Sequence, residues 1–362
     1  MVGIPVELGE RRYTITIERG AAERLADLVP RRPGGRVVVV ASRKVWSIHR
    51  KALARPLGAL EAGDPLLVPD GERFKNATTL GKLYDGFLAR GLGRDSLVVA
   101  VGGGVVGDLA GFAAATYMRG VDWAVVPTTL LAMVDSSIGG KVGFNHPKGK
   151  NLIGAFHQPR AVVVDPRFLD SLPPRELQSG AYEVLKAGIL GDPPLFQALE
   201  GVPARLAGWD PRALDAAIAA ACRIKAEVVG GDEREGGRRH VLNLGHTLGH
   251  ALEAVTRYRR FTHGEAVGWG LLAVSIIAHG RGVLDAASFR RMADAVDRLG
   301  PRPRISGISA AALVQALAHD KKSRAGRTVF VLPTAIGRVE VNDDVTTEEV
   351  MGALRALRER EA

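Results

Sequence analysis

The stretch SLVVAVGGGVVGD, residues 96–108, joins a short apolar run to a glycine-rich turn that opens into a helix-like segment. Residues without side chains at such a turn let backbone amides approach a pyrophosphate, and the start of a helix favours negative charge. The turn lacks the GxGxxG spacing of the common dinucleotide fingerprint. It still predicts a dinucleotide site after a buried strand, formed by Gly104, Val105, Val106, Gly107 and Asp108.

Four further apolar runs, at residues 36–41, 64–69, 122–128 and 161–165, place this strand in a sheet. Short apolar runs of this kind are typical of parallel strands that are covered on both faces. Helical periodicity replaces the pattern after Pro174, and a single late strand is predicted at 327–333. We therefore expect a Rossmann-like α/β parallel-sheet domain over residues 1–173, a mostly helical domain over 174–362, and an active site in the cleft between them.

Polar segments follow two of the predicted strands. Because open sheets bind ligands at the carboxyl ends of their strands, these segments extend the predicted nucleotide site. They comprise Asp70, Gly71, Glu72, Arg73, Phe74 and Lys75 after one strand, and Thr128 and Thr129 after another.

The run at residues 133–159 is rich in glycine and carries cations and amides. A flexible backbone with several such groups is what a phosphorylated, hydroxylated ligand requires, because each phosphate oxygen needs a donor. The polar residues are Asp135, Lys141, Lys148, Lys150 and Asn151, and further cations come from Lys186, Lys225, Arg239, Lys321 and Lys322.

Three side chains suited to zinc lie in the second half of the chain: Glu183, His246 and His263. A carboxylate with two imidazoles leaves coordination positions open, as a catalytic divalent site needs. Lys186 follows Glu183 at i+3 on the same helix face, and His250 follows His246 at i+4. Thr262 and Glu265 predict a capping box that places His263 in the first turn of an apolar helix.

Composition narrows the class of protein. The 362 residues carry a formal net charge of +10, 5% aromatic residues and one cysteine, Cys222. Scattered arginines with few aromatics are not the pattern of a nucleic-acid binder, whereas a basic cleft suits anionic ligands. The charged N-terminal segment lacks the apolar core of a signal peptide, and no apolar run reaches the length of a membrane span. We expect a cytoplasmic enzyme with no nucleic-acid or membrane partner.

Seven motifs together resemble the 3-dehydroquinate synthases, the second enzyme of the shikimate pathway. They are GGGVVGD (102–108), ATYMRGV (115–121), MVDSSIGGKVGFNHPKGKNLIG (133–154), EVLKAGIL (183–190), LNLGHTLGHALE (242–253), THGEAV (262–267) and DKK (320–322). The resemblance implies a lyase that is usually a homodimer. It implies NAD and a divalent metal, zinc with cobalt as a substitute. The implied reaction converts 3-deoxy-D-arabino-heptulosonate 7-phosphate, an anionic sugar acid, to 3-dehydroquinate and phosphate.

By position, the resemblance assigns Glu183, His246 and His263 as metal ligands. It adds Asp135, Lys141, Lys150, Phe168, Leu169, Asp170 and Ser171 to the nucleotide site. It assigns catalysis to Asp135, Lys141, Lys186, Arg239, Asn243 and His250. Substrate anions would meet Arg119, Lys141, Asn151, Lys186, Lys225, Arg239, Asn243, His250 and one of Lys321 and Lys322, with Arg119 reaching into the partner subunit.

One segment departs from the family pattern. The family often has an acidic or amide residue for the adenosine ribose after the first buried strand, where this chain has Ala41-Ser42-Arg43-Lys44. The two bases leave NADP open as an alternative. Three other functions also stay open: a sister sugar-phosphate cyclase such as an aminodehydroquinate synthase, a metal-dependent dehydrogenase of the glycerol type, and a non-catalytic nucleic-acid binder.

Overall fold

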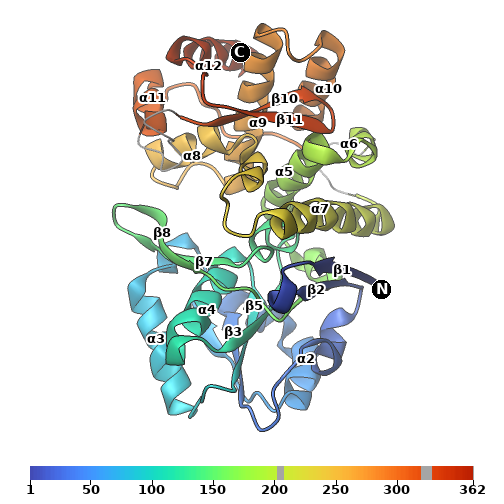
Figure 1. Cartoon of the computed structure of the whole chain (residues 1–362), viewed down its shortest axis with the longest axis vertical. Coiled ribbons are helices and arrows are strands. Elements are labelled where there is room, and N and C mark those ends of the chain that lie inside the picture. Colours follow the sequence, from blue (N-terminus) through green and yellow to red (C-terminus); the bar gives the residue numbers. More distant parts are fainter. Residues whose placement is uncertain (202–207, 319–327, 362) are drawn as a thin grey trace. The chain divides into compact units, whose positions relative to one another are not determined.

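The computed structural model describes residues 1–201, 208–318 and 328–361 (Figure 1). The chain forms two compact units. We call Met1–Leu172 with Lys225–Glu233 the sheet unit, and Pro173–Ile224 with Arg234–Ala362 the helical unit. Helix α7 (Pro211–Gly231) contributes residues to both. Among the described residues, no helix is long and apolar enough to cross a membrane.

In the described part of the sheet unit, seven strands form one sheet in the order β1-β2-β9-β6-β5-β3-β4. The strands are β1 Val2–Val6, β2 Tyr13–Ile17, β3 Val37–Ser42, β4 Leu66–Val68, β5 Leu97–Gly102, β6 Asp122–Pro127 and β9 Ala161–Val164. All neighbours pair in parallel except β1 and β2, which are antiparallel. The five predicted strands are confirmed.

The remaining elements of the sheet unit are mostly helices that connect these strands. They are η1 Gly9–Arg11, η2 Ala21–Arg24, α1 Leu25–Leu28, α2 Arg43–Ala59, η3 Glu72–Phe74, α3 Ala77–Ala89, α4 Gly104–Thr116, η4 Tyr117–Arg119, η5 Ala132–Ser136 and η6 Pro166–Ser171. In Figure 1, α2 lies on one side of the strands, and α3 and α4 lie on the other. Right-handed crossovers are expected to place the helices in this way, because the chain moves toward one edge of the sheet from β3 to β4 and toward the other edge from β4 through β5 to β6.

The predicted glycine-rich binding run folds as an antiparallel hairpin of β7 (Lys141–His146) and β8 (Gly149–Phe156). The hairpin extends from the sheet unit in Figure 1. Sequence alone predicted a flexible loop here, because the frequent glycines masked the pairing between the two halves of the run. The hairpin holds Lys141, Lys150 and Asn151 on its strands and Lys148 in its turn.

The helical unit is built around α9 (His263–Gly280), which is buried along most of its length. The other elements are α5 Pro174–Gly191, α6 Pro193–Glu200, η7 Arg238–Asn243, α8 His246–Val255, α10 Ala286–Arg298, α11 Ala310–Ala318, β10 Phe330–Ala335, β11 Arg338–Asn342 and α12 Thr347–Glu361. Strand β10 confirms the predicted late strand, and it pairs with β11.

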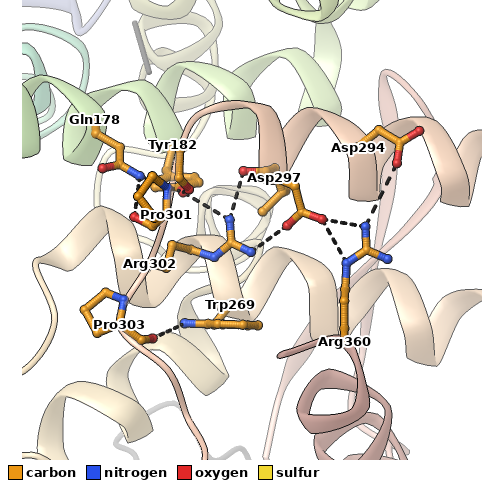
Figure 2. Close-up of polar contacts among 11 residues, drawn as sticks. Gln178, Tyr182, Trp269, Asp294, Asp297, Pro301, Arg302, Pro303 and Arg360 are labelled. Carbon is orange, nitrogen blue, oxygen red and sulfur yellow. Dashed lines mark hydrogen bonds and ion pairs between the residues drawn. The ribbon is translucent and has the colours of Figure 1, made fainter. Parts of the chain in front are cut away.

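Arg302, whose side chain is nearly inaccessible to solvent, connects three of these helices to the segment that follows α10, and Asp297 extends the group to a fourth helix (Figure 2). Arg302 donates from Nη1 to the hydroxyl of Tyr182 on α5 (3.1 Å) and from Nη2 to Asp297 on α10 (2.7 Å). Its guanidinium lies 4.6 Å from the ring centroid of Trp269 on α9. Asp297 also accepts from Arg360 of α12. We call this group the Arg302 cluster. Because Tyr182 precedes Glu183, the cluster also supports one of the predicted metal ligands.

Candidate active site

The structure brings together the three side chains that the sequence singled out as metal ligands. One ligand atom from each of Glu183, His246 and His263 lies within 4.8 Å of the others. The Nε2 atom of each histidine is 3.5 Å from Oε1 of Glu183. A carboxylate and two imidazoles that converge in this way form a donor set that fits zinc with positions left for substrate or water.

Local helix signals position these ligands. Glu183 lies in the middle of α5, whereas His246 and His263 are the first residues of α8 and α9. The predicted capping box between Thr262 and Glu265 is confirmed, and it fixes the start of α9. Gly264 allows α9 to approach α5, because a Cβ there would lie 1.9 Å from the carbonyl oxygen of Ser179.

Buried charged groups surround the three proposed metal ligands. Lys186 forms an ion pair with Glu183, and the two side chains are 5% and 1% exposed. Burial would lower the pKa of His263, but the carboxylates of Glu253 and Glu183 outweigh this effect and raise the pKa to about 10. In the absence of a metal, His263 therefore holds a proton at neutral pH.

A second carboxylate at the site, Glu253, was not among the predicted residues. Its Oε2 atom lies 3.2 Å from Nδ1 of His263, and its side chain is 4% exposed. Together with His250 and His263 it forms a second group whose ligand atoms lie within 4.8 Å of one another. A signal was present in the sequence, because Glu253 follows His246 at i+7 and His250 at i+3 on one helix face.

The other predicted residues of the helical unit lie on η7 or outside the described residues. Arg239 is buried, and Asn243 donates to Glu235 at 3.1 Å. Lys321 and Lys322 lie outside the described residues.

In the sheet unit, the predicted nucleotide residues gather around Lys75. The ammonium of Lys75 forms an ion pair with Asp108 of α4, and it donates to Asn151 of β8 (2.5 Å). Glu72 accepts from Asn145 at 2.8 Å and lies 3.5 Å from the ammonium of Lys150. Burial raises the pKa of Asp108, and Lys75 opposes the rise only in part.

Three other segments of the predicted nucleotide site lie at the start of α4, at the end of β6 and in η6. The glycine turn opens into α4, with Gly104, Val105, Val106 and Gly107 in the first turns. The hydroxyl of Thr128 is buried at the end of β6 without a hydrogen-bond partner among the described residues. Such a group fits a ligand that supplies the missing partner. In η6, the hydroxyl oxygen of Ser171 lies 2.8 Å from Nε2 of His49.

Two cations of the sheet unit are placed differently from each other. Lys225 forms an ion pair with the carboxylate of Asp135 and donates to its backbone oxygen at 2.7 Å. Lys141, the first residue of β7, is exposed. These contacts bring Asp135 and Lys225, which the sequence had placed in separate segments, into one group.

An acidic group lies beside the segment that departs from the family pattern. The hydroxyl of Ser42 donates to Asp70, and the backbone N–H of Lys44 donates to the other carboxylate oxygen at 3.0 Å. Asp70 comes from the end of the neighbouring strand β4, so the chain supplies a carboxylate at the end of β3 from a different segment.

Arg119 lies in a strained turn. It is exposed and has φ of 67°, and the preceding Met118 is exposed with φ of 51°. Residues other than glycine rarely adopt this left-handed backbone region, and such strain concentrates at functional sites.

Comparison with known proteins gives consistent matches over nearly the whole chain. A family model of the 3-dehydroquinate synthase N-terminal region matches residues 65–179, and one of the C-terminal region matches residues 180–323. A 3-dehydroquinate synthase of Solibacter usitatus is 44% identical and covers 97% of this chain and 98% of the relative. A 3-dehydroquinate synthase of Gloeobacter violaceus is 46% identical, and the match covers 99% of this chain and 100% of the relative.

Among solved structures, a 2-epi-5-epi-valiolone synthase from Streptomyces hygroscopicus subsp. jinggangensis matches with a TM-score of 0.88. It is 32% identical, and the match covers 96% of this chain and 97% of that one. That protein was solved with NAD+ and Zn2+ bound.

Proposed function

The chain belongs to the 3-dehydroquinate synthase family, and from this premise we propose that it converts 3-deoxy-D-arabino-heptulosonate 7-phosphate to 3-dehydroquinate and phosphate. The observation that carries the proposal is the convergence of Glu183, His246 and His263 beside the ammonium of Lys186. It supports a metal-dependent reaction on an anionic substrate, because an open metal site and a buried cation lie side by side.

In this proposal, Glu183, His246 and His263 hold a divalent ion, zinc or cobalt, and the residues around Lys75 and the glycine turn hold NAD. When bound, the ion would bind two neighbouring substrate hydroxyls and acidify one, and NAD would accept and later return a hydride. The substrate undergoes oxidation, elimination of phosphate, reduction, ring opening and aldol closure. The cofactor is regenerated in each turnover, so the enzyme is a lyase.

The protein's own groups bind charge, orient the substrate and move protons. Lys186, Arg239 and Lys225 would hold the substrate's anionic groups, because each cation is buried and stabilises negative charge strongly in such surroundings. His250 would move a proton, since it lies one helical turn from His246 without belonging to the proposed ligand set. Asn243 and Lys141 would position the ring, and Asp135 would orient Lys225.

We propose NAD rather than NADP on the basis of Asp70. Its carboxylate accepts from Ser42 and from the backbone of Lys44, so it lies where an adenosine ribose would follow β3. A carboxylate at this position accepts hydrogen bonds from ribose hydroxyls and repels a 2′-phosphate. Calorimetric titration with both nucleotides tests this, and equal or tighter binding of NADP would contradict it.

We also propose a cytoplasmic homodimer in which Arg119 serves the partner's site. The exposed, left-handed backbone at Met118 and Arg119 supports a role outside the chain's own core. The chain has a single cysteine, Cys222, which is buried and cannot form an intrachain disulfide, and this suits a reducing compartment.

The test is phosphate release from the proposed substrate by purified protein, with NAD and zinc added or chelated, while NADH absorbance is followed. We expect metal-dependent phosphate release that equals dehydroquinate formation, with no accumulation of NADH. The variant E183A should lose this activity, whereas E348Q, which changes an exposed acid on α12, should keep it.

Two other outcomes would redirect the assignment. Tight binding of zinc and NAD without phosphate release would move the substrate to that of a sister cyclase, as the likeness to a 2-epi-5-epi-valiolone synthase allows. Net formation of NADH would instead favour a dehydrogenase.

A further inference from the structure

The two nitrogens of His263 face two different carboxylates. Its Nε2 atom lies 3.5 Å from Oε1 of Glu183, and its Nδ1 atom lies 3.2 Å from Oε2 of Glu253. A neutral imidazole has one protonated nitrogen and one lone pair, so only one of the two nitrogens can bind a metal. The contact at the other nitrogen decides which one this is.

His246 meets the same condition by another route. Its Nδ1 atom lies 3.1 Å from the backbone carbonyl oxygen of Leu244. Because a carbonyl oxygen only accepts, Nδ1 of His246 carries the proton and Nε2 carries the lone pair. Nε2 of both histidines lies 3.5 Å from Oε1 of Glu183. If Glu253 accepts the Nδ1 proton of His263, as the carbonyl oxygen of Leu244 accepts that of His246, both Nε2 atoms carry the lone pair that a metal needs.

Close helix packing holds Glu253 in place. Glu253 lies on α8 and His263 begins α9. The two helices pack closely, because a Cβ on Gly249 of α8 would lie 3.2 Å from the backbone of Ala266 on α9. A Cβ on Gly270 of α9 would lie 1.8 Å from the carbonyl oxygen of Gly245, which precedes α8. Since the side chain of Glu253 is 4% exposed, water competes little for its carboxylate.

We propose that Glu253 is a positioning residue for the metal site: it accepts the Nδ1 proton of His263 and thereby fixes the ring with Nε2 toward the metal. This inference rests on the metal site of the proposed function, but it does not depend on the substrate. Buried carboxylates that orient a metal-binding histidine in this way also make the ring a stronger ligand.

The rival arrangement is a metal held by His250, Glu253 and His263, whose ligand atoms also converge within 4.8 Å. Glu253 would then bind the metal directly. The two arrangements share His263 and differ at every other ligand, so substitutions at His246 and His250 separate them.

The experiment measures zinc affinity by competition with a chelator, and the visible spectrum of the cobalt-loaded protein, for E253A, E253Q, H246A and H250A. We expect E253A to lower zinc affinity by roughly 10- to 100-fold. E253Q should lose less, because its amide oxygen still accepts the Nδ1 proton. H246A should abolish the visible spectrum of the cobalt-loaded protein, whereas H250A should preserve it.

Two results would overturn the proposal. Wild-type zinc affinity and an unchanged cobalt spectrum in both Glu253 variants would reduce Glu253 to a packing residue. Loss of metal in H250A and E253Q, with metal retained in H246A, would place the metal in the rival group.

The matched control is E348Q, which should leave both readouts unchanged. Circular dichroism of each metal-free variant checks folding, and E253Q keeps the size of the side chain if E253A does not fold. None of these readouts uses the sugar-phosphate substrate. A failed phosphate-release assay with the expected metal results would therefore sink the proposed function alone, and the reverse would sink this inference alone.

Discussion

At the scale of single residues, the ion pair between Lys186 and Glu183 should contribute differently to the free energy of unfolding with and without a bound metal. Both side chains are nearly inaccessible to solvent, at 5% and 1% exposed. Removing one partner of a buried pair leaves an uncompensated charge, at a cost of about 3 to 5 kcal/mol. A bound divalent ion would supply positive charge to the same carboxylate.

We therefore predict that K186M destabilises the metal-free protein much more than the zinc-loaded protein. Thermal unfolding with EDTA and with zinc measures the difference. The effect of zinc on the unfolding temperature should be larger in K186M than in the unsubstituted protein. Equal losses under both conditions would show that the metal does not compensate for the lost ammonium.

The raised pKa of His263 gives a prediction about pH. In the metal-free protein this pKa is about 10, compared with an ordinary value of 6.5. The protonated ring therefore stabilises the metal-free fold fully below about pH 6.5, and this contribution is lost as the pH rises to about 10. Zinc competes with the proton on Nε2, so zinc affinity should rise with pH through the same interval.

Calorimetry of zinc binding near pH 7.5, in two buffers that differ in ionisation enthalpy, measures the protons released. We expect about one proton per zinc ion from His263. Binding without proton release would contradict the high pKa. E253Q should release less, because it removes one of the two carboxylates that raise this pKa.

At the scale of elements, the contact between α5 and α9 aligns two metal ligands. Gly264 follows His263, and its backbone N–H donates to the hydroxyl of Ser179 at 3.0 Å. A Cβ at Gly264 would lie 1.9 Å from a backbone oxygen, which no side-chain movement relieves.

We predict that G264A lowers the free energy of unfolding by about 1 to 3 kcal/mol and weakens zinc binding, since α9 must shift and carry His263 with it. The matched control is G280A at the other end of α9, where a Cβ meets nothing within 4 Å. G280A should be neutral or slightly stabilising. Urea unfolding and chelator competition on both variants test this, and similar results for the two would contradict it.

The Arg302 cluster is the second element-scale feature. The side chain of Arg302 is 6% exposed. Its guanidinium donates hydrogen bonds to the hydroxyl of Tyr182 and the carboxylate of Asp297 (Figure 2), and to the carbonyl oxygen of Val296. We predict that R302M costs about 2 to 4 kcal/mol, because it removes three hydrogen bonds and a cation–π contact made by a nearly inaccessible side chain. R298M, on the exposed face of α10, should stay within about 0.5 kcal/mol of the unsubstituted protein. Urea unfolding of both variants measures this difference.

At the scale of the whole molecule, the proposed dimer makes a prediction about mixed subunits. If Arg119 serves the partner's site, R119A and E183A should each be inactive alone. In a mixed dimer, the R119A subunit keeps its own Glu183 and receives Arg119 from the E183A partner. Random mixing should then restore roughly a quarter of the activity, because half of the dimers are mixed and each has one complete site. No recovery after subunit exchange would contradict the proposal.

Sequence by itself determined the parallel strands and the chemically distinctive residues. The apolar runs at β3, β5, β6 and β9 are local signals, since strands buried on both faces need continuous apolar residues. Strand β1 at the edge of the sheet and its neighbour β2 were missed because each has only five residues, and β1 buries only two of them. The choice of Glu183, His246 and His263 followed from residue type and from local helix signals such as the capping box.

Only the tertiary structure decided which groups share a site. Glu253 lies on a different helix from His263, Asp70 follows β4 whereas Ser42 ends β3, and Arg302 joins helices far apart in the chain. Local patterns report which face of an element is buried, but they carry no information about which other element covers it. That depends on how close the backbones approach, which at Gly264 and Gly270 is set by the absence of a side chain.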